Sequence, residues 1–370
     1  MSEGTPNSSS RVGSALRVRP RSTERATGSL PARIVGGRYR VVKRAGEGVN
    51  AKVYFAEDIH TRQPVVVKQL TAQAAQDSSL STRFMREVHA IAGINHPNVV
   101  RIIDYGAPAY EQPYLVMESL PGETLSQLLR RQGDLNFELA MFLSRQAATG
   151  LIAVHRTGTI HRDVKPDNLY LVGPVGKPST VKIIDFGMAK LPDNRNTLGD
   201  GRFVVGTLQY MPPEQVLADP VDARADVYSL GIVMFRLFTG HLPFDVEAGL
   251  DLLGHQLFSP LPPPSWLNEA VDPRLESIIV RATRKHPQNR YQTMAALLSD
   301  LDGIVGTGRK PTTTAPERFV EPDEYLPLSA RGQEIAEGLA QRFGAKPVTQ
   351  PPEASDTPGS AQPFELARKR

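Results

Sequence analysis

The order of strand-like and helix-like sequence along the chain is the feature that most constrains its fold. Before Pro121-Gly122, alternating or β-branched segments predict strands around one helix at 81–93; these segments are 39–44, 52–57, 64–70, 99–105 and 114–118. After it, helical periodicity dominates at 125–131 and 137–157, with short extended pieces at 169–172 and 181–184. The sequence therefore predicts an α+β fold with a small β-rich N-terminal lobe and a larger helical lobe.

Composition excludes several classes of protein. The 370 residues include no cysteine, so disulfides, thiolate metal sites and cysteine nucleophiles are excluded. No apolar run reaches the length of about 18 residues that a membrane span needs, so we expect a cytoplasmic protein. The net charge of +4 arises in residues 1–38, where seven arginines face two glutamates, and the rest of the chain carries −1. This basic tail is poor evidence for nucleic-acid binding, and no nucleic-acid partner is expected.

We expect one domain at 38–304, with a lobe at 38–118, a hinge at 118–121 and a second lobe at 122–304. Residues 1–37 are rich in Ser, Gly, Pro and Arg and predict a disordered tail. The same composition fits a mitochondrial transit peptide, but a clear amphipathic helix is missing. Residues 305–370 are rich in Pro and Thr and predict a second tail, in which apolar spacing at 329–343 indicates a short helix.

The most informative motif is HRDVKPDN at residues 161–168. Asp185-Phe186-Gly187 follows 22 residues after Asp163, Lys68 ends the run VVVK, and Glu87 lies in the expected helix at 81–93. This ordered set resembles the signature of eukaryotic-type serine/threonine protein kinases, and in wording it resembles the bacterial members. The resemblance covers about residues 39–303 and implies a two-lobed kinase fold that uses ATP with Mg²⁺, or with Mn²⁺ as an alternative, on protein substrates.

The chemistry of phosphoryl transfer explains these residue types. Lys68 can supply a fixed cation for phosphate oxygens, and the carboxylate of Glu87 can orient it as an ion pair. Asp185 and the amide oxygen of Asn168 suit Mg²⁺, which prefers oxygen ligands. By resemblance, Asp163 accepts the proton of the substrate hydroxyl and Lys165 steadies the phosphate. Each residue could also have a structural role alone, such as a core salt bridge or a turn.

The stretch AGEGVNAKVY at 45–54 resembles the flap that covers the nucleotide in kinases. A strand pattern follows it, whereas a dinucleotide-binding turn would lead into a helix. Ala51 replaces the third glycine. One methyl there matters only if φ is positive or the backbone crowds the phosphate, so we expect at most a modest loss of nucleotide affinity. The expected nucleotide-binding residues are Ala45, Gly46, Glu47, Gly48, Val49, Asn50, Ala51, Lys52, Val53, Val66, Lys68, Met117, Glu118 and Leu120.

Three of those positions have specific expected roles. Val66 stands where the family usually has alanine, so its bulk is expected to press on the adenine. Met117 resembles the residue at the rear of the pocket. The hinge at Glu118-Ser119-Leu120 is expected to offer backbone donors and acceptors to adenine.

The activation segment at 188–205 is identified by position. Thr207 resembles the residue that shapes the substrate platform. Thr197 is the candidate phosphorylation site of the activation segment, since it is the single threonine of the loop before Thr207. By resemblance, Glu214 pairs with Arg290, Asp226 anchors the catalytic loop, and His161 packs under Phe186. Two rival hypotheses remain. One is a pseudokinase scaffold that binds nucleotide or partners without catalysis, and the other is a small-molecule kinase of similar fold.

Overall fold

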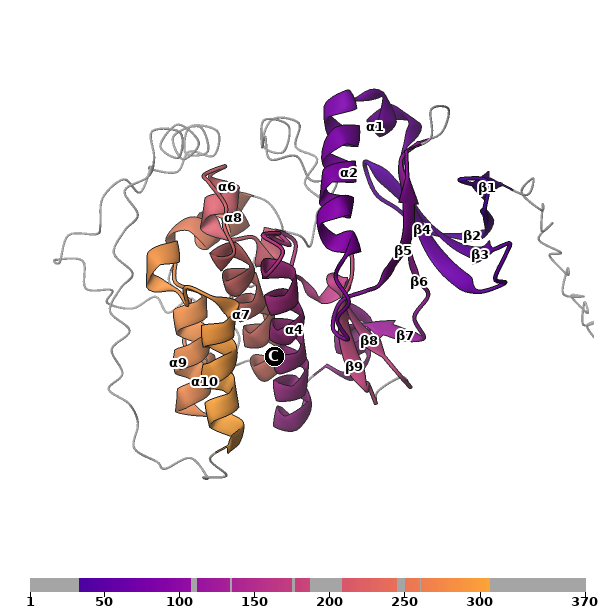
Figure 1. Ribbon diagram of the computed structural model, residues 1–370. Coiled ribbons are helices and arrows are strands. Elements are labelled where there is room, and N and C mark those ends of the chain that lie inside the picture. The colour runs from indigo at the N-terminus through magenta and orange to yellow at the C-terminus, as the bar shows by residue number, and fades with distance from the viewer. Residues whose placement is uncertain are drawn as a thin grey trace, which may run out of the picture. The chain divides into compact units, whose positions relative to one another are not determined.

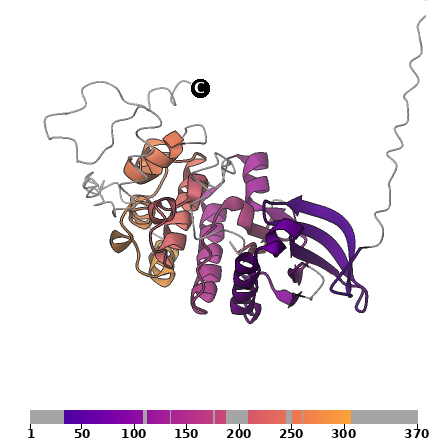
Figure 2. The same cartoon turned by 90° about the horizontal axis from the view of Figure 1, so that it is seen from above.

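A computed structural model describes residues 33–107, 112–133, 135–174, 177–186, 208–244, 250–259 and 261–306. Its first part is a six-stranded antiparallel sheet, sheet A, with strand order β1-β2-β3-β4-β6-β5 (Figure 1). The strands are β1 Ile34–Val35, β2 Tyr39–Glu47, β3 Ala51–Asp58, β4 Pro64–Leu70, β5 Ile102–Gly106 and β6 Tyr114–Glu118. The strands of this sheet, in indigo and violet, curve visibly in Figure 2.

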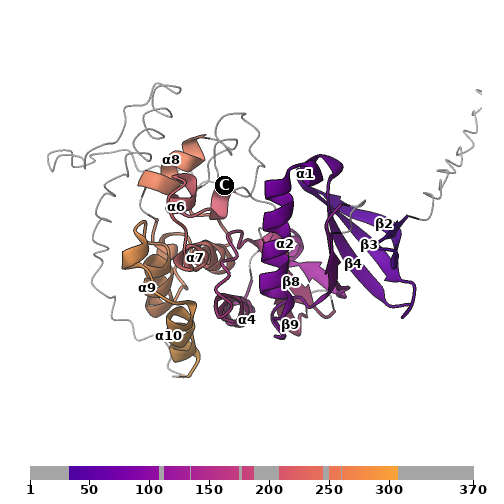
Figure 3. The same cartoon turned by 45° about the horizontal axis from the view of Figure 1, so that its top comes forward.

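Two helices accompany sheet A. Helix α1 spans Ala72–Gln76 and α2 spans Ser78–Ala92. The side chain of Asp77 caps α2 by accepting from the amides of Ser79 and Leu80, so the helix begins three residues earlier than the apolar spacing predicted. Figures 1 and 3 show α2 between strands β2–β4 and the helices that follow.

The second lobe contains a small antiparallel sheet, sheet B, and a group of helices. Sheet B has the order β7-β8-β9, formed by Gly122–Thr124, Leu169–Val172 and Thr180–Ile183. The helices are α3 Leu125–Gln132, α4 Phe137–His155, α6 Pro213–Val216, α7 Arg224–Thr239, α8 Leu250–Phe258, α9 Pro273–Ala282 and α10 Met294–Gly306. Short 3₁₀ turns lie at η1 Pro166–Asn168, η2 Leu208–Tyr210, η3 Pro264–Trp266 and η4 Pro287–Asn289.

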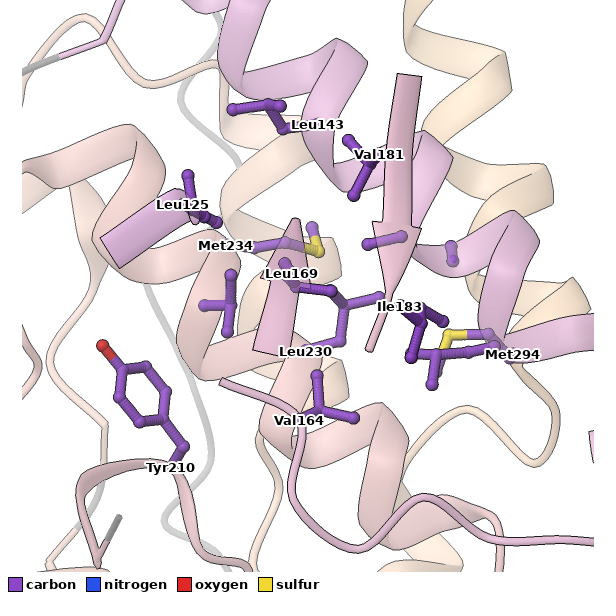
Figure 4. Packing of buried hydrophobic residues seen from close by; sticks show 14 of the residues in the cluster. Leu125, Leu143, Val164, Leu169, Val181, Ile183, Tyr210, Leu230, Met234 and Met294 are labelled. Atoms are coloured by element: carbon purple, nitrogen blue, oxygen red, sulfur yellow. The ribbon is translucent and has the colours of Figure 1, made fainter. Parts of the chain in front are cut away.

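Helix α7 is at the centre of the second lobe. Nearly all of its residues are buried, and it contacts α4, α9 and α10. Gly231 allows the approach to α9, because a Cβ at that position would lie 2.6 Å from Thr283 Cγ2. Figure 4 shows part of the surrounding core, where Leu230 and Met234 of α7 pack near Leu169 and Val164. Because Val164 follows Asp163 directly, this core also holds the segment that carries the main motif.

The N-terminal boundary differs from the prediction. Strand β1 lies inside the stretch 1–37 that was expected to be a tail, and Val35 and Tyr39 are almost fully buried in a second, smaller core. Gly36 and Gly37 form the tight turn between β1 and β2 with φ of 58° and 66°. Two apolar residues are too short a run to show strand periodicity, so sequence reasoning missed this strand.

The predicted two-lobed α+β architecture is confirmed. Strands β4, β6 and β8 have the predicted bounds, whereas α1 and β7 were not foreseen. In the described ranges no helix combines the length and the apolar character that crossing a bilayer requires. The tails at 1–32 and 307–370, including the expected helix at 329–343, lie outside the described residues.

Candidate active site

The expected nucleotide flap is the hairpin of β2 and β3. Its turn is closed by the amide of Gly48, which donates to the carbonyl of Ala51 at 2.8 Å, and Val49 at its tip is 81% exposed. Two register shifts in β2, at Val41/Lys43 and Arg44/Gly46, bend the strand along its length. The flap is therefore an exposed, curved hairpin. Its turn joins two strands, as the sequence predicted.

Ala51, at the position of the third glycine, turns its side chain into the core. Its side chain is only 6% exposed and belongs to the same core cluster as Leu70 and Ala74. Its φ is not positive, and neither is that of Gly46 or Gly48. The methyl of Ala51 therefore packs into the core, and the expectation of at most a modest loss of nucleotide affinity stays a prediction.

Lys68 extends from β4 toward Asp185, which comes shortly after β9 of sheet B. Val65 and Val67 of the same strand belong to the smaller core, and the alternation along the strand turns Lys68 to the other face. Lys68 lies opposite Val53 in the strand pairing and is 6% exposed. Its Nζ donates a hydrogen bond to Oδ1 of Asp185, which brings the two expected phosphate- and metal-binding residues together.

The expected ion pair between Lys68 and Glu87 is absent from the described structure, and this expectation was wrong for the conformation seen here. Oε2 of Glu87 is buried and has no hydrogen-bond partner. Burial raises the pKa of Glu87, and the positive charges of Arg162, Lys68 and Arg83 oppose this rise. Sequence placed Glu87 on the correct helix, but the rotation and position of α2 decide what its carboxylate reaches.

The segment 161–168, expected to be the catalytic loop, brings three predicted residues together. Lys165 Nζ lies 3.0 Å from Oδ2 of Asp163. The amide nitrogen of Asn168 donates to the backbone carbonyl of Asp163 at 2.8 Å and to its Oδ2 at 3.0 Å. These contacts fix the carboxylate of Asp163 and turn the NH₂ group of Asn168 toward it.

Asp226 of α7 holds the backbone of this loop by hydrogen bonds. Its carboxylate accepts from the amides of His161 and Arg162, at 2.8 and 2.9 Å. Nε2 of His155 lies 2.7 Å from Oδ2 of Asp226. The anchor supports a backbone in which Arg162 has a φ of 62°, a conformation that L-residues seldom adopt. The contact with His155 was not foreseen, because 71 residues separate the partners.

His161 and Phe186 pack as expected, with ring centroids 5.1 Å apart. Asp185 has a φ of 53°, which turns the chain directly after sheet B. Gly187, the rest of the activation segment with Thr197, and Thr207 lie outside the described residues.

The hinge is more constrained than the sequence suggested. The amide of Glu118 donates to the carbonyl of Arg101, and its Oε1 accepts from the amide of Arg101 and from Nζ of Lys182, both at 2.8 Å. The hydroxyl of Tyr170 donates to the carbonyl of Leu120 at 3.1 Å. The backbone amide of Glu118 is therefore paired with Arg101, and the expectation that residues 118–120 offer donors and acceptors to adenine stays a prediction.

Two other predicted pocket residues lie side by side. Val66 of β4 pairs directly with Met117 of β6 in the sheet register. Met117 is 9% exposed and belongs to the larger core, and Val66 packs against that core. The extra bulk of Val66 thus adjoins the residue expected at the rear of the pocket.

The predicted pair of Glu214 and Arg290 forms a buried bidentate ion pair. Nη1 and Nη2 of Arg290 donate to Oε1 and Oε2 of Glu214, each at 2.7 Å. Arg290 is 1% exposed and also donates to the carbonyls of Arg284, Lys285 and Arg224. This pair ties α6 to the segment before α10.

Few side chains in the described residues are placed to bind a metal ion. No cluster of three or more His, Cys, Asp or Glu side chains suited to a metal occurs in that part of the chain. The NH₂ group of Asn168 is committed to Asp163, so its amide oxygen is the atom that could ligate a metal together with the carboxylate of Asp185. One carboxylate and one amide oxygen fit Mg²⁺, which commonly completes its shell with water and substrate phosphates.

Residues 39–300 match a family model described as "Protein kinase domain". A curated relative, the serine/threonine-protein kinase PknB of Mycobacterium tuberculosis, is 37% identical over 268 residues, covering 71% of this chain and 42% of the relative. Serine/threonine-protein kinase Pkn1 of Myxococcus xanthus is 40% identical over 266 residues, covering 72% of this chain and 38% of the relative. The chain thus spans about two fifths of the length of these relatives.

A solved structure gives a similar result for the fold. The kinase domain of PknI from Mycobacterium tuberculosis has a TM-score of 0.57 and 24% sequence identity. The alignment covers 74% of this chain and 99% of the solved one. At this identity the likeness concerns the fold.

Proposed function

Because the chain belongs to the protein kinase domain family, we propose that it transfers the γ-phosphate of ATP to serine and threonine hydroxyls of proteins. The names of the relatives PknB and Pkn1 support the serine/threonine class. One observation carries the proposal: four residues that the sequence singled out are linked by hydrogen bonds, Lys68 to Asp185 and Asn168 to Asp163.

In this proposal Asn168 and Asp185 hold Mg²⁺, with Mn²⁺ as an alternative. The side chain of Asp185 is 47% exposed and therefore accessible to an ion, whereas the side chain of Lys68 is 8% exposed. When bound, the ion neutralises charge on the phosphates of the nucleotide. Lys68 binds phosphate oxygens. The nucleotide and the metal would therefore each take one partner of the present hydrogen bond between Lys68 and Asp185 and replace it.

Asp163 is the proposed acceptor of the substrate proton. The hydroxyl oxygen of the substrate attacks the γ-phosphorus, the bond from that phosphorus to the bridging oxygen breaks, and ADP leaves. The hydroxyl proton passes to the carboxylate of Asp163, which Asn168 holds in place. Lys165, 3.0 Å from that carboxylate, is close enough to place its charge beside the transferred phosphate.

The flap residues, Val66 and Met117 are the proposed walls of the nucleotide pocket. The substrate platform is proposed to include Thr207, and Thr197 is the proposed site of autophosphorylation in the activation segment. Such a reaction draws on the ATP of the cytoplasm, where we expect the protein to act on protein partners. Mass spectrometry after incubation with ATP tests Thr197, since an active protein that carries no phosphate on Thr197 would contradict that assignment.

The main experiment compares the purified chain with two variants, using labelled ATP and a generic basic protein. Asp163→Asn should reduce transfer by about a thousandfold, because the proton acceptor is lost. Asp167→Asn, an exposed aspartate of the same motif, is the matched control and should transfer normally. A chain that binds ATP without any transfer would be a pseudokinase, and one that phosphorylates only small molecules would be the other rival.

A further inference from the structure

The 3₁₀ turn η2, Leu208–Tyr210, directly follows Thr207 in the sequence. This turn is held by buried side chains from two helices that are distant in sequence. Gln256 of α8 is fully buried, and so is Tyr228 of α7. Ser229 of α7 is 4% exposed, and its hydroxyl donates to the carbonyl of Tyr210 at 2.8 Å. The segment beside the proposed substrate platform therefore rests on α7 and α8.

Gln256 makes the most specific of these contacts. Its Nε2 donates to the backbone carbonyl of Gln209 at 2.8 Å and to that of Leu208 at 3.4 Å. Its Oε1 accepts from the hydroxyl of Tyr228 at 2.5 Å. Carbonyl oxygens can only accept, so the amide must turn its NH₂ group to η2 and its oxygen to Tyr228.

The backbone of Gln256 is fixed as well. Nζ of Lys285, itself 5% exposed, donates to the carbonyl of Gln256 at 2.9 Å and to that of His255 at 3.2 Å. These bonds hold the end of α8, where carbonyls lack partners within the helix. Both the main chain and the side chain of Gln256 are thus held in one position.

Packing alone does not require an amide at this position. The neighbouring α8 residues Leu252, Leu253 and Leu257 are buried in an apolar cluster together with Leu208. An apolar side chain at 256 would bury with less desolvation, because an amide must make all its hydrogen bonds to offset that cost. Gln256 makes them, and two go to the backbone of η2.

We propose that Gln256, oriented by Tyr228, is a positioning residue for protein-substrate binding. It fixes the backbone of residues 208–210 and, through it, the start of the segment that receives the substrate. The inference rests on the proposed function, because that proposal assigns substrate binding to the segment at Thr207. Its effect should fall on the peptide, since the hydrogen bonds of Gln256 in the described part of the chain go to η2, Tyr228 and Lys285 and to none of the residues expected to hold ATP.

Three variants test the proposal. Gln256→Met keeps the length of the side chain and removes its hydrogen bonds. Gln256→Glu keeps the shape but directs an acceptor at two carbonyls. Tyr228→Phe removes only the hydroxyl that orients Gln256. The matched control is Ser144→Ala, which removes a fully buried hydrogen bond within α4, remote from η2.

The measurements separate peptide binding from the remaining chemistry. KM for a peptide substrate should rise about tenfold in Gln256→Met, because a buried hydrogen-bonded position is lost, and more in Gln256→Glu. KM for ATP and the hydrolysis of ATP without peptide should stay within about twofold. Tyr228→Phe should show a smaller change of the same kind, and Ser144→Ala should show none. Equal losses in peptide phosphorylation and in ATP hydrolysis, or an unchanged KM for peptide, would overturn the proposal.

Hydrogen exchange supplies a readout that does not depend on activity. In Gln256→Met, the backbone amides that follow η2, including that of Met211, should exchange faster than in the unaltered protein, since Met211 donates to Leu208. Unchanged exchange there would refute the positioning role, even in a protein without kinase activity. Absence of transfer by the unaltered protein would instead refute the proposed function.

Discussion

Lys68 contacts Asp185 and not Glu87, although all three residues belong to the same expected site. The carboxylate of Glu87 has a buried oxygen without a hydrogen-bond partner, next to the charges of Arg162, Lys68 and Arg83. A catalytic arrangement that uses the Lys68–Glu87 pair would require α2 or these side chains to move. We therefore expect Glu87 to have opposite effects on the stability of the nucleotide-free state and on activity.

Glu87→Gln should raise the thermal stability of the nucleotide-free protein at pH 7. The pKa of Glu87 is raised by folding, so the ionised form destabilises the folded state above the unfolded pKa. The wild-type protein should lose this part of its stability as pH rises through the window from the unfolded to the folded pKa. The gain from Glu87→Gln should vanish below about pH 4, where the carboxyl is protonated in both states.

The same variant should lose about tenfold to a hundredfold in kcat/KM, because it removes the carboxylate that the kinase resemblance assigns to orienting Lys68. Thermal melts across pH 4–8 and steady-state kinetics check the two effects. A lower melting temperature at pH 7 would show that Glu87 is paired in solution.

Ala51→Gly should affect stability more than nucleotide binding. The methyl of Ala51 is buried with Leu70 and Ala74, so its removal together with the greater backbone freedom of glycine should cost about 1–2 kcal/mol. KM for ATP should stay within about twofold. Denaturant unfolding and ATP titration measure the two quantities, and a tighter ATP complex in the variant would contradict the packing seen here.

Glu214→Gln should strongly destabilise the second lobe. It leaves the guanidinium of Arg290 buried without its counter-charge, which typically costs about 3–5 kcal/mol. Asp302→Asn is the matched control, because it breaks the ion pair with Arg145, whose side chains are 41% and 47% exposed. That exposed pair should contribute less than about 1 kcal/mol. Similar unfolding curves for the two variants would argue against a structural role for the buried pair.

Asp226→Asn should reduce kcat with little change in KM for ATP. The aspartate holds the backbone amides of His161 and Arg162, and the φ of Arg162 needs such support. An amide side chain can keep one acceptor but loses charge, so we expect about a tenfold to hundredfold loss in kcat. The KM for ATP should hold because Lys68 is carried by a different element. A KM that changes as much as kcat would indicate general unfolding.

Local sequence signals were sufficient for several elements. The run around Val65–Lys68 predicted β4 with its observed bounds, since β-branched residues between turn signals have few other structures available. The motif around Asp163 predicted that Asp163, Lys165 and Asn168 belong to one site, and they lie in contact because residues within five positions are constrained by the chain itself. The signal for α2 was displaced, since Asp77 as its cap lies outside the apolar pattern.

By itself, the sequence determined the family, the two-lobed order of strands and helices, and the residue types of the site. Tertiary structure alone decided that Ala51 packs into the core, that Lys68 contacts Asp185, and that Gln256 meets η2. The physical reason is that residue type and spacing specify what a side chain can bind. Which partner it meets depends on the relative positions of elements that packing brings together across many residues of chain.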